Sequence, residues 1–188
     1  MGQSGVQGLA ALSVMSPVES IALALLIGMS NAAAVLVGNQ IGAKNYEAVY
    51  YQAIGMTILS LIVGIVVALI LYLCQGLVLD AFRALTDETR ALAEKFMVIL
   101  CFGIILRSIP MMVIVGVLRA GGDVKFCLYQ DLIAQWLIGI PLAAFAAIGL
   151  RWEPEWVFLL FLTEEVIKWG GSLYRMKTQR WMKNLIEN

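Results

Sequence analysis

The chain has 188 residues, of which 61% are hydrophobic and 14% are charged, whereas a soluble domain carries about 45–50% apolar and about 25% charged residues. The 13 basic and 13 acidic residues cancel, so no charge excess points to a nucleic-acid partner. Histidine, the commonest general base and metal ligand, is absent. This composition indicates an integral membrane protein that lies in the lipid bilayer.

Five stretches of the sequence are apolar and long enough to span the hydrocarbon, which requires about 20 residues. They lie at roughly 9–42, 48–79, 88–118, 126–150 and 156–178. None alternates with period two and none is as short as a barrel strand, so we expect an all-α protein with five transmembrane helices. The first stretch is longer than a bilayer requires, and it should tilt, kink at Pro17 or protrude.

Basic residues in the short loops predict the orientation. One side collects seven of them, Lys44, Arg119, Lys125, Arg175, Lys177, Arg180 and Lys183, and the other collects four, Arg83, Arg90, Lys95 and Arg151. The side with seven should be cytoplasmic, which places the N-terminus outside and the C-terminus inside the cell membrane. The tail also carries Trp169, Tyr174 and Trp181, which suit the membrane interface. On the outer side, residues 80–96 read as an amphipathic helix with Thr86 as its N-cap.

The fourth stretch carries one acid, Asp131, on a polar or small stripe with four-residue spacing that includes Cys127, Gln135 and Gly139. A carboxylate at membrane depth costs on the order of 3 kcal/mol, so Asp131 should face a cavity or a partner helix. Two interpretations stay open. Asp131 is either a protonated acid that is hydrogen-bonded to a neighbouring helix or a site for H⁺ or Na⁺, and Gln135 could donate to the ionised acid or help to ligate the ion.

Other charges also lie within the predicted spans. Glu19 either lines a cavity or lies near the outer interface. Arg107 should form an ion pair with Glu164 or Glu165, and Glu164 and Lys168 stand four residues apart on one helix, where they can satisfy each other.

Small residues and helix-breaking residues indicate where helices should pack closely, end or bend. The small-residue surface from Ser30 to Gly38 should pack closely against another helix. The GNQIG element at 38–42 should end the first helix, and Pro141 leaves the carbonyl of Leu137 without its helical donor, so that the helix can bend there. No HExxH, GxSxG or P-loop pattern occurs, and RAGGD lacks a GK[ST] ending, so we expect no enzyme activity and no cofactor.

Three segments resemble one transporter family. SNAAAVLVGNQIGAKN at 30–45 resembles the end of the second helix of a lobe in MATE (multidrug and toxic compound extrusion) transporters. GVLRAGGDVKF, followed by DLIAQWLIGIPLA, resembles a cytoplasmic junction between two helices, and EEVIKWGGSLYRMKTQRWMKNL resembles the last helix and basic tail. The order of residues that carries this likeness includes Asn31, Gly38, Gly42, Arg119, Gly121, Gly122, Trp136 and Pro141.

The resemblance implies a specific architecture and function. Such transporters have twelve helices in two six-helix lobes around a central cavity, and they exchange Na⁺ or H⁺ for organic cations and drugs. This chain matches helices eight to twelve, a partial C-terminal lobe that would need the N-terminal lobe of the same transporter. Asp131 then matches the tenth-helix acid of the cation site, and Glu19 matches an acid in the eighth helix of some members. A lone partial lobe cannot form a two-sided cavity, so we expect the chain to be part of a longer one.

Two other functions stay open. A lipid-linked oligosaccharide flippase of the same superfamily would need a strongly cationic cavity, but Arg107 is the one basic residue within the apolar stretches 1–43, 48–79, 96–118 and 126–150 of the first four spans. A non-transporting membrane remnant or assembly partner would need no cavity at all. The upstream DNA would distinguish this alternative from a transporter fragment, because it would encode a first lobe only in the case of a transporter.

Overall fold

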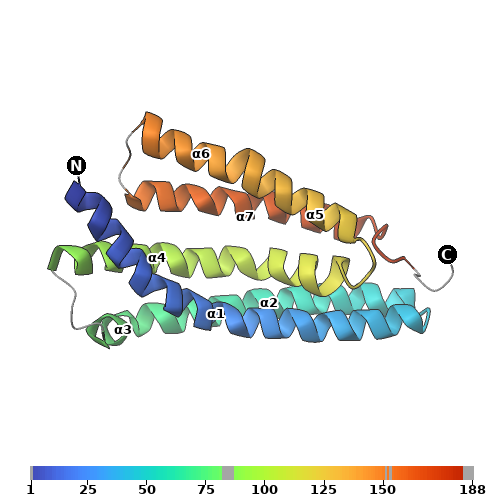
Figure 1. The fold of residues 1–188 in the computed structure, drawn as a ribbon. Coiled ribbons are helices and arrows are strands. Elements are labelled where there is room, and N and C mark those ends of the chain that lie inside the picture. Colours follow the sequence, from blue (N-terminus) through green and yellow to red (C-terminus); the bar gives the residue numbers. More distant parts are fainter. Residues whose placement is uncertain (1, 82–86, 151, 153, 184–188) are drawn as a thin grey trace.

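The computed structural model describes residues 2–81, 87–150, 152 and 154–183, and these residues form helices joined by short turns, without a strand. The helices are α1 Gly2–Gly42, α2 Tyr46–Leu73, α3 Gln75–Ala81, α4 Asp87–Pro110, η1 Met111–Leu118, α5 Val124–Leu132, η2 Ile133–Gly139, α6 Ile140–Ala144, η3 Phe145–Gly149 and α7 Pro154–Lys177. The η segments are π-helical, with wider turns than an α-helix, and they continue the helices before them. The described residues therefore form five long helical rods and the short helix α3 (Figure 1).

The rod made of α4 and η1 is the centre of the bundle. It contacts α1 and α2 on one side and α7 on the other, and α7 in turn carries the rod that runs from α5 to η3 (Figure 1). In the rod made of α4 and η1, 56% of the most apolar 18-residue stretch is buried. The corresponding share in the other three apolar rods is 22–28%. The remaining apolar surface faces outward, as a bilayer requires.

Four rods of the described chain are long and apolar enough to cross a membrane: Met15–Gly42, Tyr46–Leu73, Thr89–Leu118 and Val124–Gly149. The prediction of an all-α membrane protein is therefore confirmed. The fifth predicted span corresponds to α7, which has 24 residues but carries Glu164, Glu165 and Lys168 within its length.

Several predicted helix ends differ from the structure. The stretch at 48–79 is divided at Cys74 into α2 and α3. With 28 residues, α2 is already about 42 Å long, which exceeds the hydrocarbon thickness of about 30 Å, so the chain turns where it leaves that layer. Pro17 lies inside α1, whose N-terminal part leans across α4 (Figure 1). Thr86, the predicted N-cap, lies outside the described residues.

The small-residue surface of α1 packs as predicted at Ser30 and Ala33 but not at Gly38. A Cβ on Gly116 of η1 would lie 2.9 Å from the Ser30 carbonyl oxygen and 3.1 Å from the Ala33 Cβ, so glycine permits this close approach. The buried line continues through Val37, and Gly38 lies one residue further round the helix, about 100° away, where it is exposed. Asn31 and Gly42 are exposed too, and α1 ends at Gly42 as predicted.

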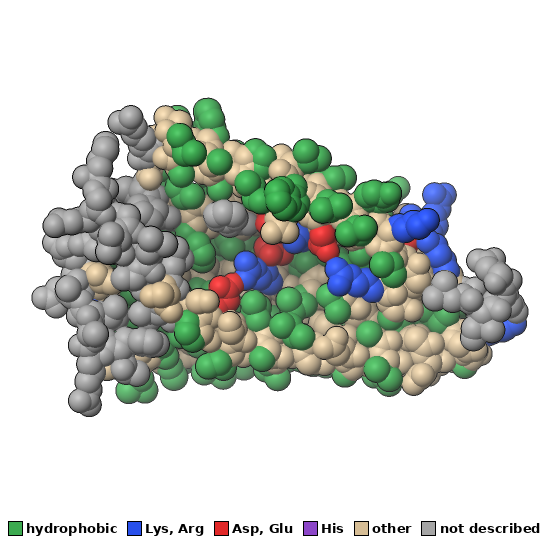
Figure 2. Space-filling view, in the orientation of Figure 1, with side chains coloured by type: hydrophobic (Ala, Val, Ile, Leu, Met, Phe, Trp, Pro, Cys, Tyr) green, Lys and Arg blue, Asp and Glu red, His purple; other side chains and the backbone are tan. Residues whose placement is uncertain are grey.

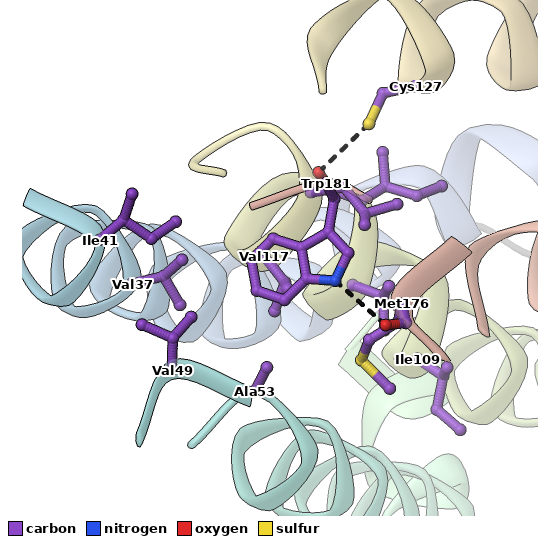
Figure 3. Close-up of a cluster of buried hydrophobic side chains, with 12 residues drawn as sticks. Val37, Ile41, Val49, Ala53, Ile109, Val117, Cys127, Met176 and Trp181 are labelled. Carbon is purple, nitrogen blue, oxygen red and sulfur yellow. Dashed lines mark hydrogen bonds between the residues drawn. The ribbon is translucent and has the colours of Figure 1, made fainter. Parts of the chain in front are cut away.

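The C-terminal segment folds back onto the turn between η1 and α5 (Figure 3). Trp181 is fully buried, and its Nε1 donates a hydrogen bond to the Met176 carbonyl oxygen over 3.1 Å. A Cβ on Gly121 would lie 2.3 Å from the Trp181 ring, and Gly122 adopts a φ of 89° that favours glycine. The indole therefore occupies the space that the missing side chain of Gly121 leaves.

Candidate functional site

A cavity of about 410 Å³ lies between α1, the central rod, α5–η2 and α7. Figure 2 shows Lys, Arg, Asp and Glu side chains gathered in the middle of the pictured face, with hydrophobic side chains on both sides of them. The charged and polar side chains that line the cavity are Arg107, Arg119, Asp131, Gln135, Glu164, Glu165 and Lys168. Asp131 and Gln135 therefore both face the cavity, as their spacing predicts.

Arg107 joins three helices at one side of the cavity. Its Nε lies 3.1 Å from Glu165 Oε1 on α7, and its Nη1 pairs with Glu19 Oε1 on α1. The predicted pairing of Arg107 with an acid of the last helix is confirmed at Glu165. The contact with Glu19 is an addition, because the sequence alone does not place α1 against α4.

A second set of charges surrounds Asp131. Arg119 Nη2 lies 2.9 Å from Asp131 Oδ2, and Lys168 Nζ lies 3.7 Å from Asp131 Oδ1 and 2.5 Å from Glu164 Oε1. The predicted pair of Glu164 and Lys168 is confirmed. Asp131 thus lies between two cations that belong to the chain itself, a contact that sequence reasoning missed although an intramembrane lysine signals a buried partner.

Hydrogen bonds and glycines hold the helices that carry these groups. Gln130 Nε2 donates to the Lys168 carbonyl oxygen over 2.7 Å and joins α5 to α7. A Cβ on Gly171 would lie 2.9 Å from that nitrogen, so glycine is needed for the contact. A Cβ on Gly139 of η2 would lie 3.2 Å from Glu164 Oε2. Trp169 Nε1 donates to the Leu106 carbonyl oxygen over 2.5 Å and ties α7 to the central rod.

The remaining predicted residues lie outside the cavity. Trp136 is 62% exposed on the outer face of η2. Pro141 lies in the first turn of α6, directly after the π-helical turns of η2. A proline that removes a helical hydrogen bond is commonly accommodated by wider turns, and η2 is one of two segments, with η3, in which the fourth rod departs from regular α geometry.

The charges of the network nearly balance. Four acids, Glu19, Asp131, Glu164 and Glu165, face three bases, Arg107, Arg119 and Lys168. The network is therefore not the strongly cationic surface that a lipid-linked oligosaccharide would require. Within the part of the chain that the structure describes, no three His, Cys, Asp or Glu side chains are grouped so as to hold a metal ion.

A helical membrane bundle with ionisable groups around a cavity between its helices is typical of transport proteins. The family model of MatE matches residues 1–145, and the chain belongs to the MatE family. The resemblance seen in the sequence is thereby confirmed.

The curated relatives that the chain matches are longer, and the chain spans 30–39% of the length of the three described here. The chain is 26% identical over 185 residues to the uncharacterized transporter YisQ of Bacillus subtilis, an alignment that covers 96% of the chain and 39% of YisQ. It is 31% identical over 138 residues to the probable multidrug resistance protein NorM of Bacillus cereus, covering 71% of the chain and 30% of NorM. Protein DETOXIFICATION 20 of Arabidopsis thaliana is 24% identical over 153 residues, covering 80% of the chain and 31% of that protein. No solved structure matches the chain.

Proposed function

We propose that the chain forms part of the C-terminal lobe of a transporter that exchanges Na⁺ or H⁺ for organic cations or drugs across the cytoplasmic membrane. The family and the relatives described as multidrug resistance and detoxification proteins support export of foreign compounds. The other half of the central cavity would come from an N-terminal lobe of the same transporter, with the C-terminus of this chain in the cytoplasm.

The observation that carries the proposal is the position of Asp131. Its carboxylate faces the cavity within the fourth span, and it pairs there with Arg119 and Lys168. Coupled exchange needs a group that is stable in two charge states at this depth. Ion pairs stabilise the charged carboxylate, and burial stabilises the protonated one.

The apolar part of the cavity favours an amphipathic cation as substrate. Leu23, Met111, Ile114 and Val115 line the cavity beside the charged groups. A cation with an apolar body can bury that body against these side chains while its charge approaches Asp131. The coupling ion and the substrate would then compete for one carboxylate.

Substitution of Asp131 tests this role. Asp131→Asn keeps size and hydrogen bonding but removes titration, so it should abolish ethidium efflux driven by an imposed Na⁺ or pH gradient in everted vesicles. The protein should be expressed from its natural gene with any flanking coding sequence, and membrane insertion should be unchanged. Asp80→Asn, at an exposed aspartate that pairs with Arg90 outside the cavity, is the matched control. Efflux equal to the parent's across the working pH and Na⁺ range would show that Asp131 is structural.

A further inference from the structure

We infer that Lys168 is a tethered cation that occupies a site formed by Asp131 and Glu164, and that it must leave this site before a substrate cation binds. This inference rests on the proposed function, which names Asp131 alone. It adds Glu164 as a second carboxylate and Lys168 as the residue that sets the affinity of the site for positive charge.

The geometry around Lys168 resembles an occupied cation site. Its Nζ lies 2.5 Å from Glu164 Oε1 and 3.7 Å from Asp131 Oδ1, so one ammonium contacts two carboxylates on two different helices. The side chains of Lys168 and Glu164 are each 14% exposed, and that of Asp131 is 31% exposed. A single positive charge between two shielded carboxylates is what an organic ammonium ion would provide.

The site is built independently of the ammonium that fills it. Gln130 holds α5 to α7 through the backbone carbonyl of Lys168 and not through its side chain. The close fit of Gly171 against Gln130, and of Gly139 against Glu164, fixes the same helices. The two carboxylates would therefore stay in place when the Lys168 side chain moves away.

Lys168 is better suited to this role than Arg119, the other cation on Asp131. Arg119 is 45% exposed and pairs with Asp131, whereas Lys168 bridges both acids. A lysine ammonium is a compact charge on a flexible four-carbon stem, so it can withdraw without movement of the helix. Once it is withdrawn, two acids are left without this partner, a costly arrangement that an incoming cation relieves.

Ethidium binding to the purified protein, measured by fluorescence polarisation, tests the inference. Lys168→Met keeps the apolar stem and removes the charge, so it should lower the Kd for ethidium by about twofold to fivefold, the scale of one partly exposed ion pair. Lys168→Arg, which keeps the charge, should show a smaller increase in affinity for ethidium. Lys177→Met, an exposed lysine at the end of the same helix, is the matched control and should bind like the parent. The double variant Asp131→Asn, Lys168→Met should not show the increased affinity for ethidium. A Kd for Lys168→Met equal to or above the parent's would overturn the inference.

A second measurement needs no substrate. Dicyclohexylcarbodiimide labels protonated carboxyl groups within the membrane, and peptide mass spectrometry reads its product at Asp131. Loss of the nearby ammonium favours the protonated acid, so Lys168→Met should label faster than the parent and Lys177→Met should not. If Lys168→Met does not give a monodisperse protein, Lys168→Gln, which also removes the charge but can still donate a hydrogen bond to Glu164, should show the same faster labelling.

The two measurements separate the inference from the proposed function. Faster labelling without ethidium binding in any variant would support the tethered cation and contradict transport of such organic cations. Ethidium binding that requires Asp131, with labelling and affinity unchanged in Lys168→Met, would support the proposed function and overturn the inference.

Discussion

Asp123 is the buried acid that joins the C-terminal segment to the turn between η1 and α5. Its two carboxylate oxygens accept hydrogen bonds from Arg175 Nε over 2.5 Å and from Lys183 Nζ over 2.7 Å. Burial by itself raises the pKa of the Asp123 carboxyl, but the hydrogen bonds from Arg175 and Lys183 outweigh burial and hold the pKa below its ordinary value of 3.8. The carboxylate therefore stabilises the folded chain in its charged form.

The first prediction follows from this lowered pKa. Asp123→Asn should reduce the free energy of unfolding by about 1.5–3 kcal/mol near neutral pH, the range for hydrogen bonds to charged groups. A depressed folded-state pKa gives a stabilisation that is complete above the unfolded value of about 4 and is lost as the pH falls through the folded value. The deficit of the variant should therefore shrink below about pH 4. The deficit can be measured as a loss of thermal stability in detergent, monitored by size-exclusion chromatography at a series of pH values. A deficit that is constant down to acid pH would mean that the charge is not involved.

At the scale of whole elements, the contact between α1 and η1 depends on small side chains. Ala33 is 2% exposed and lies against Gly116, whereas a Cβ on Gly38 would meet nothing within 4 Å. The two positions lie on one helix and differ mainly in the face on which they lie. They form a matched pair for testing whether close packing or helix propensity matters here.

Ala33→Leu should lower the free energy of unfolding by about 1–3 kcal/mol, because extra atoms must fit into a filled contact. Gly38→Leu should be close to neutral or stabilising, since leucine is the better helix former and the position is open. The temperature at which half of the protein leaves the monodisperse peak would report both effects. Equal losses at Ala33 and Gly38 would show that both faces of α1 are packed in the membrane.

At the scale of the whole molecule, the fold gathers the basic turns at one end of the bundle. The α1–α2 turn, the turn after η1 and the C-terminal segment lie together there, and α3 and the start of α7 lie at the other end (Figure 1). Loops rich in lysine and arginine stay in the cytoplasm. The bundle therefore carries a charge asymmetry that predicts its orientation.

Cysteine labelling tests that orientation. In a variant in which Cys74, Cys101 and Cys127 are replaced by alanine, a cysteine at exposed Gly76 should react with an impermeant maleimide added to intact cells. A cysteine at exposed Ala43 should react only after the membrane is opened. The reverse pattern would invert the topology and place the C-terminus outside.

The sequence by itself determined the helices and much of the local chemistry of the site. Apolar runs with single charges define the rods, because a backbone in lipid must satisfy its hydrogen bonds internally. The pairing of Glu164 with Lys168 and the cavity-facing positions of Asp131 and Gln135 follow from helical spacing, which fixes neighbours three and four residues apart. The family resemblance depends on residues of the same local segments.

Only the tertiary structure decided which helices meet and how their charges pair. Glu19 and Arg107 are 88 positions apart, and their contact depends on how α1 crosses α4, which apolar faces of similar composition do not specify. The bridge from Lys168 to Asp131 likewise requires α5 to lie against α7 in one register, set by Gln130. The burial of Trp181 could not be read from the sequence, because the space beside Gly121 exists only once the turn has formed. Spacing along a helix is a local property, whereas the register between helices emerges only when their side chains pack.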